Sequence, residues 1–310
     1  MPAPLLELRD LRTQFSTQEG VVSAVDGISL RIENGQTLAV VGESGCGKSV
    51  MARSILQLIP TPPGKIVGGE VLYQGTDLLK RNAEQMCDIR GKEISMIFQE
   101  PMTSLNPVLT VGDQVAEIIL EHENIGRKNA RARVLELFNL VNIPAAGKRV
   151  REYPHQLSGG MRQRVMIAIA LSCDPEVLIA DEPTTALDVT IQAQILKLLI
   201  DLQARLGMAM LLITHDLGIV RKMAGRVCVM KDGEIVESGE TPRVFDAPAH
   251  PYTRELLAAE PGGSPGPGNP EAPVLLNTDN LKVWFPIKKG ILRRVVGHVR
   301  AVDGVTLNLR

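Results

Sequence analysis

The octapeptide GESGCGKS at residues 42–49 restricts the possible folds of this 310-residue chain more than any other stretch. It matches the pattern G-x-x-x-x-G-K-[S/T] in full. Residues 36–41 before it, QTLAVV, are continuously apolar, as in a strand buried on both faces. After it, apolar residues recur at helical spacing until Pro60. A buried strand, a glycine-rich turn and a helix are the context in which such a loop binds phosphate groups, so the sequence predicts a nucleotide-binding domain.

Each part of this loop has a chemical role in binding ATP. The glycines allow a tight backbone path whose N–H groups point at phosphate, and the helix N-terminus adds its positive dipole. Lys48 can reach the β- and γ-phosphates, and the Ser49 hydroxyl can hold Mg²⁺. An ordinary glycine turn is the alternative, and the flanking strand and helix argue against it. Cys46 invites a redox role, but we interpret it as a tolerated small residue. The expected nucleotide-binding residues are Gly42, Glu43, Ser44, Gly45, Cys46, Gly47, Lys48 and Ser49.

Two further apolar runs end in chemically active side chains. VLIADE at 177–182 ends in two acids: Asp181 can hold Mg²⁺ directly or through water, and Glu182 is the candidate general base for an attacking water. LLITHD at 211–216 includes His215, which could contact the γ-phosphate. The alternatives are a charged strand end facing solvent and a structural histidine. The phosphate loop favours catalysis for the acids, whereas the role of the histidine depends on its neighbours.

The order of these patterns favours a mostly parallel α/β sheet. The section from Thr110 to about Val150 has no strand pattern and predicts a helical insertion. Residues 228–239 predict a hairpin that turns at Asp232-Gly233. Residues 261–273, PGGSPGPGNPEAP, have the composition of a linker, so the first domain is expected to end near residue 260. The other predicted elements are strands at 5–11, 21–32, 177–180 and 210–214 and helices at 160–172 and 190–206.

Composition argues against several classes of protein. A net charge of -1 and 3% aromatic residues give no basis for a nucleic-acid partner. No apolar run approaches the roughly 20 residues of a membrane-spanning helix, and the N-terminus lacks a secretory pattern. The four cysteines are scattered without a CxxC pair, which disfavours zinc or disulfides and fits a reducing cytoplasm.

A second glycine-rich turn, LSGGMRQR at 157–164, opens a helix from about Met161 but has no lysine. One domain hardly needs two phosphate-binding turns, unless the second serves a nucleotide held by another domain. The set GESGCGKS, LSGGMRQR, VLIADEP, TALD and ITHD, in this order, resembles the ATPase domain of ABC transporters over residues 5–260. The resemblance implies an α/β P-loop NTPase fold with an antiparallel β subdomain, a mostly parallel core sheet and a helical subdomain at about 100–172.

The same resemblance implies ATP and Mg²⁺ as cofactors and assigns further roles. Phe15 would stack on adenine, and Gln99 would reach Mg²⁺ and the attacking water and touch the membrane subunits. His215 would be the switch histidine, and Asp188 would cross a dimer interface. The γ-phosphate of the ATP carried by the opposite domain would be bound by Ser158, Gly159 and Gly160. The expected catalytic set is Glu182, His215 and Gln99, and the expected metal set is Ser49, Gln99 and Asp181.

Two segments indicate the substrate class. FQEPMTSLNP at 98–107 and HPYTRELLAA at 250–259 look like the peptide and nickel importer branch of the family. In that branch the ATPase energises peptide uptake with separate permease subunits in the membrane and a periplasmic binding protein. The chain would then lie peripherally at the cytoplasmic face of the bacterial inner membrane. ATPases of two-subunit dipeptide systems often carry a cysteine cluster after the HPYT segment, and this chain has none there.

The beginning of the chain is repeated after the predicted linker. LLELRDL at 5–11 aligns with LLNTDNL at 275–281, and AVDGISLRI at 24–32 aligns with AVDGVTLNL at 301–309. Two hairpins that share a common turn sequence are the alternative, which the matching order disfavours. We therefore expect residues 274–310 to be the truncated beginning of a second ABC ATPase domain, as in tandem importer ATPases of the glutathione or microcin C type.

The second copy is expected to contribute little order and no catalysis. Two strands without the sheet beneath them bury too little apolar surface to fold stably alone. Within this copy, Phe285 is the candidate for a second adenine-stacking side chain, and Trp284 is its competitor.

Two rival functions remain open from the sequence. The first is a soluble ABC ATPase that acts on the ribosome or on nucleic acid. Ribosomal members have a long charged helical linker, and DNA-repair members insert zinc cysteines; the Pro/Gly-rich linker and scattered cysteines of this chain resemble neither. The second rival is a regulatory nucleotide-binding module without turnover, against which Glu182 and His215 argue.

Overall fold

The computed structural model describes residues 3–99, 104–185, 187–259, 272–290 and 294–310. The chain divides into two compact units, Met1–Glu260 and Pro261–Arg310, which we treat separately. Most of the predicted linker at 261–273 lies outside the described residues. Within the described part of the chain, no helix combines the length and the apolarity that crossing a bilayer requires.

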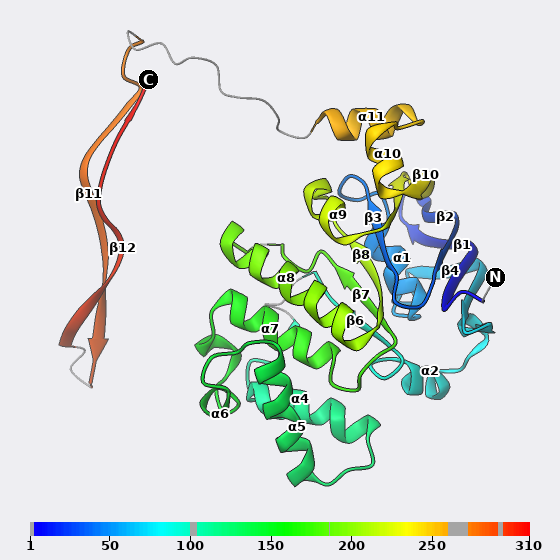
Figure 1. Cartoon of the computed structure of the whole chain (residues 1–310), viewed down its shortest axis with the longest axis horizontal. Coiled ribbons are helices and arrows are strands. Elements are labelled where there is room, and N and C mark those ends of the chain that lie inside the picture. The colour runs from blue at the N-terminus through cyan, green and yellow to red at the C-terminus, as the bar shows by residue number, and fades with distance from the viewer. Residues whose placement is uncertain (1–2, 100–103, 186, 260–271, 291–293) are drawn as a thin grey trace. The chain divides into compact units, whose positions relative to one another are not determined.

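Unit one begins with an antiparallel sheet whose strand order is β2-β1-β4-β5 (Figure 1). Its strands are β1 Leu6–Thr17, β2 Gly20–Ile32, β4 Gly64–Tyr73 and β5 Thr76–Asp77. One face of β1 is apolar, and its residues Leu6, Leu8 and Leu11 are buried in a core shared with helix α1 (Lys48–Ile55). The antiparallel β subdomain expected from the resemblance is therefore present.

The second sheet of unit one has the order β10-β9-β3-β8-β7-β6. Strands β6 to β9 and β3 run parallel, and β10 is antiparallel to β9. Because the carboxyl ends of parallel strands meet at one edge of a sheet, the segments that follow β3, β7 and β8 are brought to the same edge. The strands are β3 Thr37–Val41, β6 Ile94–Ile97, β7 Val177–Asp181, β8 Ala209–Ile213, β9 Arg226–Lys231 and β10 Glu234–Glu240.

Helices surround this parallel sheet (Figure 1). Helix α1 ends at Ile55, well before Pro60, so the predicted helix end is wrong. The backbone at Gln57 adopts a φ of 50°, which is left-handed and cannot continue the helix. The other helices are α2 Ala83–Ile89, α4 Val111–His122, α5 Arg127–Leu140, α6 Ala146–Arg149, α7 Gly159–Ala170, α8 Val189–Leu206, α9 Leu217–Met223, α10 Thr241–Asp246 and α11 Pro251–Ala258, with 3-10 turns η1 Leu78–Lys80 and η2 Pro154–Gln156.

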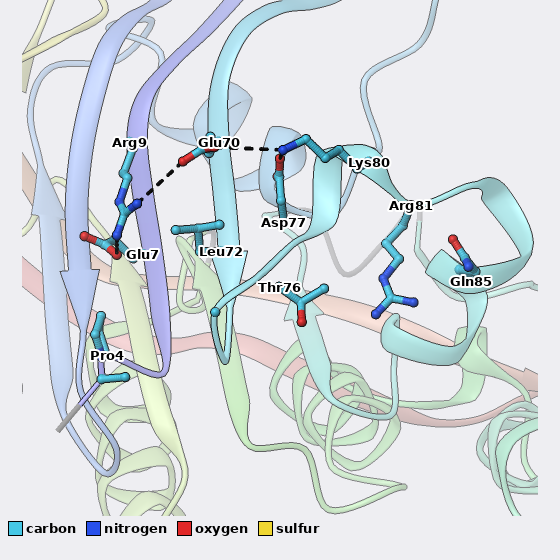
Figure 2. A pocket seen from close by; sticks show the side chains of 12 residues that line it. Pro4, Glu7, Arg9, Glu70, Leu72, Thr76, Asp77, Lys80, Arg81 and Gln85 are labelled. Carbon is cyan, nitrogen blue, oxygen red and sulfur yellow. Dashed lines mark hydrogen bonds and ion pairs between the residues drawn. The ribbon is translucent and has the colours of Figure 1, made fainter.

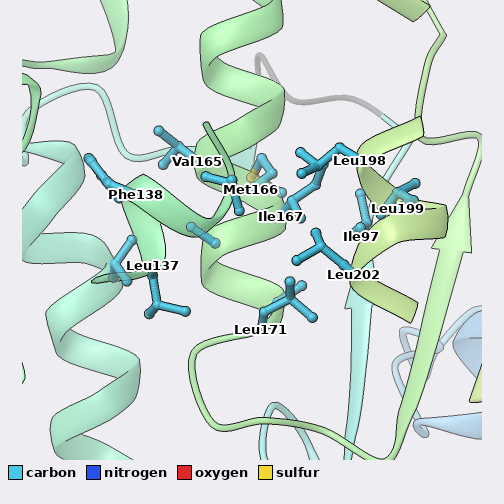
Figure 3. Packing of buried hydrophobic residues seen from close by; sticks show 14 of the residues in the cluster. Ile97, Leu137, Phe138, Val165, Met166, Ile167, Leu171, Leu198, Leu199 and Leu202 are labelled. Carbon is cyan, nitrogen blue, oxygen red and sulfur yellow. The ribbon is translucent and has the colours of Figure 1, made fainter. Parts of the chain in front are cut away.

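The helical region is joined to the sheet by one apolar core. Phe138 of α5, Val165 of α7 and Leu198 of α8 belong to the same buried cluster, which also includes Ile97 of β6 (Figure 3). The insertion predicted from Thr110 is thus a set of helices that share a core with α7 and α8. Residues 100–103, at the start of the expected helical subdomain, lie outside the described residues.

Unit two is a two-stranded antiparallel sheet of β11 (Leu276–Lys289) and β12 (Arg294–Leu309). We expected little order here, but the structure shows two paired strands. The pairing is possible because two adjacent segments can satisfy each other's backbone hydrogen-bonding groups in one local ladder. The large apolar side chains are nevertheless exposed: Leu281 is 44% and Val305 is 47% accessible. The hairpin therefore has a regular backbone without a buried core.

Candidate functional site

The GESGCGKS segment forms the turn between β3 and α1. Gly47 has a φ of 104°, and a Cβ at this residue would lie 2.1 Å from the carbonyl oxygen of Ala24 on β2. No other residue type fits this space without moving the backbone. The Gly233 N–H in the β9–β10 turn donates to the Cys46 carbonyl at 3.0 Å. Neighbouring strands therefore hold the loop in its tight path.

The Lys48 side chain is folded onto this loop. The residue is 5% exposed, and its Nζ donates to the carbonyl oxygens of Gly42 at 2.8 Å and Glu43 at 2.7 Å. Glu43 and the next two residues, Ser44 and Gly45, form the exposed part of the turn. An ammonium fixed within a glycine-rich turn at a helix N-terminus suits an anionic ligand with several phosphate groups.

Ser49 contacts the carboxylate of Asp181, with which it is expected to bind a metal ion. The Ser49 hydroxyl donates to Asp181 Oδ1 at 2.9 Å. Asp181 is fully buried, and its Oδ2 has no hydrogen-bond partner among the described residues. Burial raises the pKa of Asp181, the Ser49 hydrogen bond opposes this rise, and the charge of Glu182 adds to it. A buried carboxylate oxygen without a partner, beside a hydroxyl, fits a hard divalent cation such as Mg²⁺.

Three side chains surround the carboxylate of Glu182. Gln99 Nε2 donates to Glu182 Oε2 at 3.0 Å, and the Thr185 hydroxyl donates to the same oxygen at 2.8 Å. His215 Nδ1 lies 3.4 Å from Oε1. The Glu182 side chain is 12% exposed and that of His215 is 64% exposed, so the imidazole stands on the solvent side. The predicted catalytic residues Gln99, Glu182 and His215 therefore form one cluster.

The residues expected to act on another domain's nucleotide lie at two helix N-termini. Ser158 Oγ accepts from the Met161 N–H at 3.4 Å and caps α7, and Asp188 accepts from the Ile191 N–H at 2.9 Å and caps α8. A Cβ at Gly160 would lie 2.6 Å from Ile191 Cγ2, so the first turns of the two helices are in contact. The exposed members of this group are Ser158, Gly159 and Asp188.

Phe15, the expected adenine-stacking residue, lies in the antiparallel sheet. It is half-buried near the end of β1, where it pairs with Val22 of β2 and Gly64 of β4. It is therefore on a different sheet from the phosphate loop, and its role in adenine binding stays a prediction.

Two residues that contact this site escaped the sequence analysis. Thr185, which bonds Glu182, follows the VLIADEP segment, so its closeness to the acids was the available signal. The Tyr252 hydroxyl accepts the backbone N–H of Glu43 in the phosphate loop at 3.1 Å. Tyr252 belongs to the HPYT segment, which we used only as a sign of the substrate branch.

A separate pocket of about 700 Å³ lies over β1, β4 and η1 and is lined by none of the predicted site residues (Figure 2). Several of its charged side chains pair with one another: Arg9 lies 3.6 Å from Glu70, and Lys80 lies 3.1 Å from Asp77. The predicted site residues therefore lie around the phosphate loop and not in this pocket.

Comparison with known proteins identifies a family and several similar chains. Residues 25–185 match the family model described as "ABC transporter". The chain is 54% identical over 307 residues to "Peptidoglycan transport ATP-binding protein YejF" of Agrobacterium fabrum, covering 99% of this chain and 56% of that one. It is 53% identical over 257 residues to "Oligopeptide transport ATP-binding protein OppD" of Bacillus subtilis, covering 83% of this chain and 72% of that one.

A solved structure supports the fold. The match is the "Dimeric structure of a post-hydrolysis state of the ATP-binding cassette MJ0796 bound to ADP and Pi". Its TM-score is 0.69 at 28% identity, and the match covers 76% of this chain and 98% of that chain.

A parallel sheet with a phosphate loop and two acids at its edge, joined to an antiparallel sheet and a helical region, defines an ATP-binding cassette fold. The chain belongs to the ABC transporter family. It spans 56% of the length of the Agrobacterium relative and 59% of the length of "Uncharacterized ABC transporter ATP-binding protein YejF" of Escherichia coli.

Proposed function

We propose that this chain is the ATP-binding and ATP-hydrolysing part of an ABC importer for peptides. The observation that carries the proposal is the cluster around Glu182, in which Gln99 and Thr185 bond one carboxylate oxygen and His215 lies beside the other. Glu182 directly follows Asp181 in the sequence, and Asp181 accepts a hydrogen bond from Ser49 of the phosphate loop. Relatives named for oligopeptide and dipeptide transport and for glutathione import support peptides as the substrate and import as the direction.

In this proposal the loop at 42–49 binds ATP, and Lys48 reaches its phosphates. Ser49 Oγ and Asp181 Oδ2 are the oxygens that would hold Mg²⁺, and Gln99 would contribute its amide oxygen, because its nitrogen is bonded to Glu182. Bound Mg²⁺ supplies positive charge that stabilises the charge developing on the transferred phosphoryl group.

Glu182 would orient and polarise the attacking water. Its Oε2 already accepts hydrogen bonds from Gln99 and Thr185, so Oε1 is the oxygen left to accept from a water. His215 stands beside Oε1 and is mostly exposed. It could therefore link this carboxylate to a γ-phosphate and respond to the presence of that phosphate.

The exposed helix caps would act on a nucleotide held by a second cassette. Ser158 lies at the N-terminus of a 12-residue helix, where the first-turn N–H groups and the helix dipole favour an anion. Asp188, whose own carboxylate caps an 18-residue helix, would cross the interface between the two cassettes. Pairing of two cassettes is supported by the solved relative, whose printed description is dimeric. Each nucleotide would then lie between the loop at 42–49 of one cassette and the turn at 157–164 of the other.

We further propose that residues 1–260 form one ABC ATPase domain and residues 274–310 begin a second, after a linker. The β11–β12 ladder supports this, because it repeats the register of β1–β2. At the two ends of the ladders, Leu6–Ile32 corresponds to Leu276–Leu309, and Phe15–Val22 corresponds to Phe285–Val299.

The proposed partners of the assembled protein are integral-membrane permease subunits and, through them, a periplasmic peptide-binding protein. The proposed location is the cytoplasmic face of the bacterial inner membrane, with peripheral attachment. The relatives named as transport ATP-binding proteins support this arrangement.

Substitution Glu182→Gln tests the proposal, because it keeps the size of the side chain and removes the base. We expect single-turnover hydrolysis of MgATP by the purified chain to slow by about 10²–10⁴-fold, with the Kd for ATP unchanged. Lys48→Ala is the control that should lose ATP binding. Normal hydrolysis by Glu182→Gln would contradict the catalytic assignment. A wild-type chain that pairs its cassettes on ATP and still never hydrolyses the nucleotide would instead support a module without turnover.

A further inference from the structure

The HPYT segment at 250–253 contacts the phosphate loop. Tyr252, in the first turn of α11, is 4% exposed. Its hydroxyl oxygen accepts the backbone N–H of Glu43 at 3.1 Å, a hydrogen bond between residues 209 positions apart. This bond links the last helix of unit one to the loop that is expected to bind phosphate.

The neighbouring strands fix the position of this tyrosine. The Glu237 carboxylate on β10 accepts the N–H groups of Ala249 at 2.8 Å and His250 at 3.0 Å, which anchors the start of α11. His250 Nδ1 then accepts the N–H of Tyr252 at 3.2 Å. On β9, Lys231 Nζ lies 4.7 Å from the centroid of the tyrosine ring, within the range of a cation–π contact. The ring and its backbone are therefore both held.

The Glu43 N–H that Tyr252 accepts lies in the same peptide group as the Gly42 carbonyl, and this carbonyl accepts from Lys48 Nζ at 2.8 Å. The next carbonyl along the loop also orients the lysine. The Glu43 carbonyl accepts from Lys48 Nζ at 2.7 Å and from the Cys46 N–H at 3.4 Å. Its N–H, on the other side of the same residue, is bonded to Tyr252. A movement of Glu43 would therefore move the carbonyl to which the ammonium is bonded.

We infer that Tyr252 is a positioning residue for ATP binding: it holds Glu43, and Glu43 sets the place from which Lys48 meets the phosphates. This inference rests on the proposed binding of ATP by the loop. The HPYT segment then has a physical function, because it bonds the last helix of unit one to the phosphate loop of the same unit. The effect belongs to nucleotide binding and not to the chemical step, since none of the described contacts of Tyr252 involves Asp181, Glu182 or His215.

The test is Tyr252→Phe, which keeps the ring against Lys231 and removes only the hydroxyl oxygen. Loss of this one hydrogen bond should raise the Kd and the KM for MgATP by about fivefold. The kcat at saturating ATP should stay within about twofold of wild type, because binding that is equal in the ground and transition states affects KM alone. Binding is measured by titrating MgATP into the full chain. The temperature is kept below the unfolding midpoint of each variant, so that a loss of stability is not mistaken for a loss of affinity.

Tyr73→Phe is the matched control. Tyr73 is also buried, at 6% exposure, and its hydroxyl oxygen lies 3.1 Å from Glu93 Oε2 and 3.0 Å from Glu176 Oε2, both outside the phosphate loop. This variant should leave KM unchanged. If Tyr252→Phe and Tyr73→Phe both bind MgATP as wild type does, the inference is wrong. If the wild-type chain itself does not bind MgATP, the proposed function fails first.

Discussion

The β1–β2 hairpin and the β11–β12 hairpin pair their residues in the same register. The first pairs are Leu6–Ile32, Leu8–Leu30, Leu11–Ile28, Thr13–Val25 and Phe15–Val22; the second are Leu276–Leu309, Thr278–Leu307, Leu281–Val305, Val283–Val302 and Phe285–Val299. Their irregularities also coincide, because Asp10 and Asn280 have φ angles of 47° and 48°. The two ladders are therefore the same local structure.

Their surroundings differ. Leu6 and Leu11 are fully buried, whereas the corresponding Leu276 and Leu281 are 49% and 44% exposed. In unit one, β1 also pairs with β4, and its apolar face packs on α1. The comparison teaches that the ladder follows from local pairing, while burial depends on elements contributed by the rest of a domain.

The largest expected difference between the hairpins is in stability. Leu11→Ala should lower the free energy of unfolding of unit one by about 2–5 kcal/mol, because it leaves a cavity in a packed core. The matched variant Leu281→Ala should cost less than about 0.5 kcal/mol, because its site is exposed. Helical circular dichroism during urea unfolding reports unit one, and fluorescence of Trp284, the single tryptophan of the chain, reports unit two. Equal losses of unfolding free energy in the two variants would contradict the proposed difference in burial between the hairpins.

The next largest expected difference between the hairpins is in their contribution to adenine binding. If Phe15 stacks on the base as the family resemblance implies, Phe15→Ala should weaken MgATP binding by about 1–3 kcal/mol, and Phe15→Tyr should restore it. Phe285→Ala should have no effect on the affinity of this chain, because residues 261–310 contain no phosphate-loop pattern. Isothermal titration of MgATP into each variant distinguishes the two positions. An unchanged affinity in Phe15→Ala would show that the adenine site lies elsewhere.

The smallest expected effect is one that the hairpins share. The Asp10 N–H donates to Ser29 Oγ at 2.9 Å, and the Asn280 N–H donates to Thr306 Oγ1 at 3.1 Å. Ser29→Ala and Thr306→Ala should each cost about 0.5–1 kcal/mol, since each removes one exposed hydrogen bond at the same bulge. The same urea experiment, read by dichroism for the first and by Trp284 for the second, measures both. A large loss of unfolding free energy in only one hairpin would mean that the stability of the bulge depends on the residues packed around it.

Much of the site was predictable because its residues directly follow apolar strands. Lys48 follows β3 through the glycine turn, and Asp181 and His215 stand at or just beyond the ends of β7 and β8. Parallel strands bring these ends to one edge, so sequence order and strand polarity were sufficient. The end of α1 was misjudged because the left-handed backbone at Gln57 depends on packing and not on a proline or glycine at that position.

Contacts between distant segments were beyond this reasoning. No pattern in residues 250–253 indicates that Tyr252 reaches Glu43, because the contact depends on how β9, β10 and α11 stack at the end of the sheet. The same holds for Gln99: the family resemblance implied that it reaches Mg²⁺ and the attacking water, and nothing in the sequence indicated its bond to Glu182.

The sequence by itself determined the phosphate loop, the acids, the mostly parallel α/β sheet and the repeated hairpin, because each depends on short-range patterns of polarity and turn-forming residues. The tertiary structure alone decided which oxygen of Glu182 is already bonded, that Asp181 Oδ2 is buried beside Ser49, and that Tyr252 holds the loop. The physical reason is that hydrogen-bond partners and burial are set by side chains from separate strands and helices, which meet only when the sheets and helices pack.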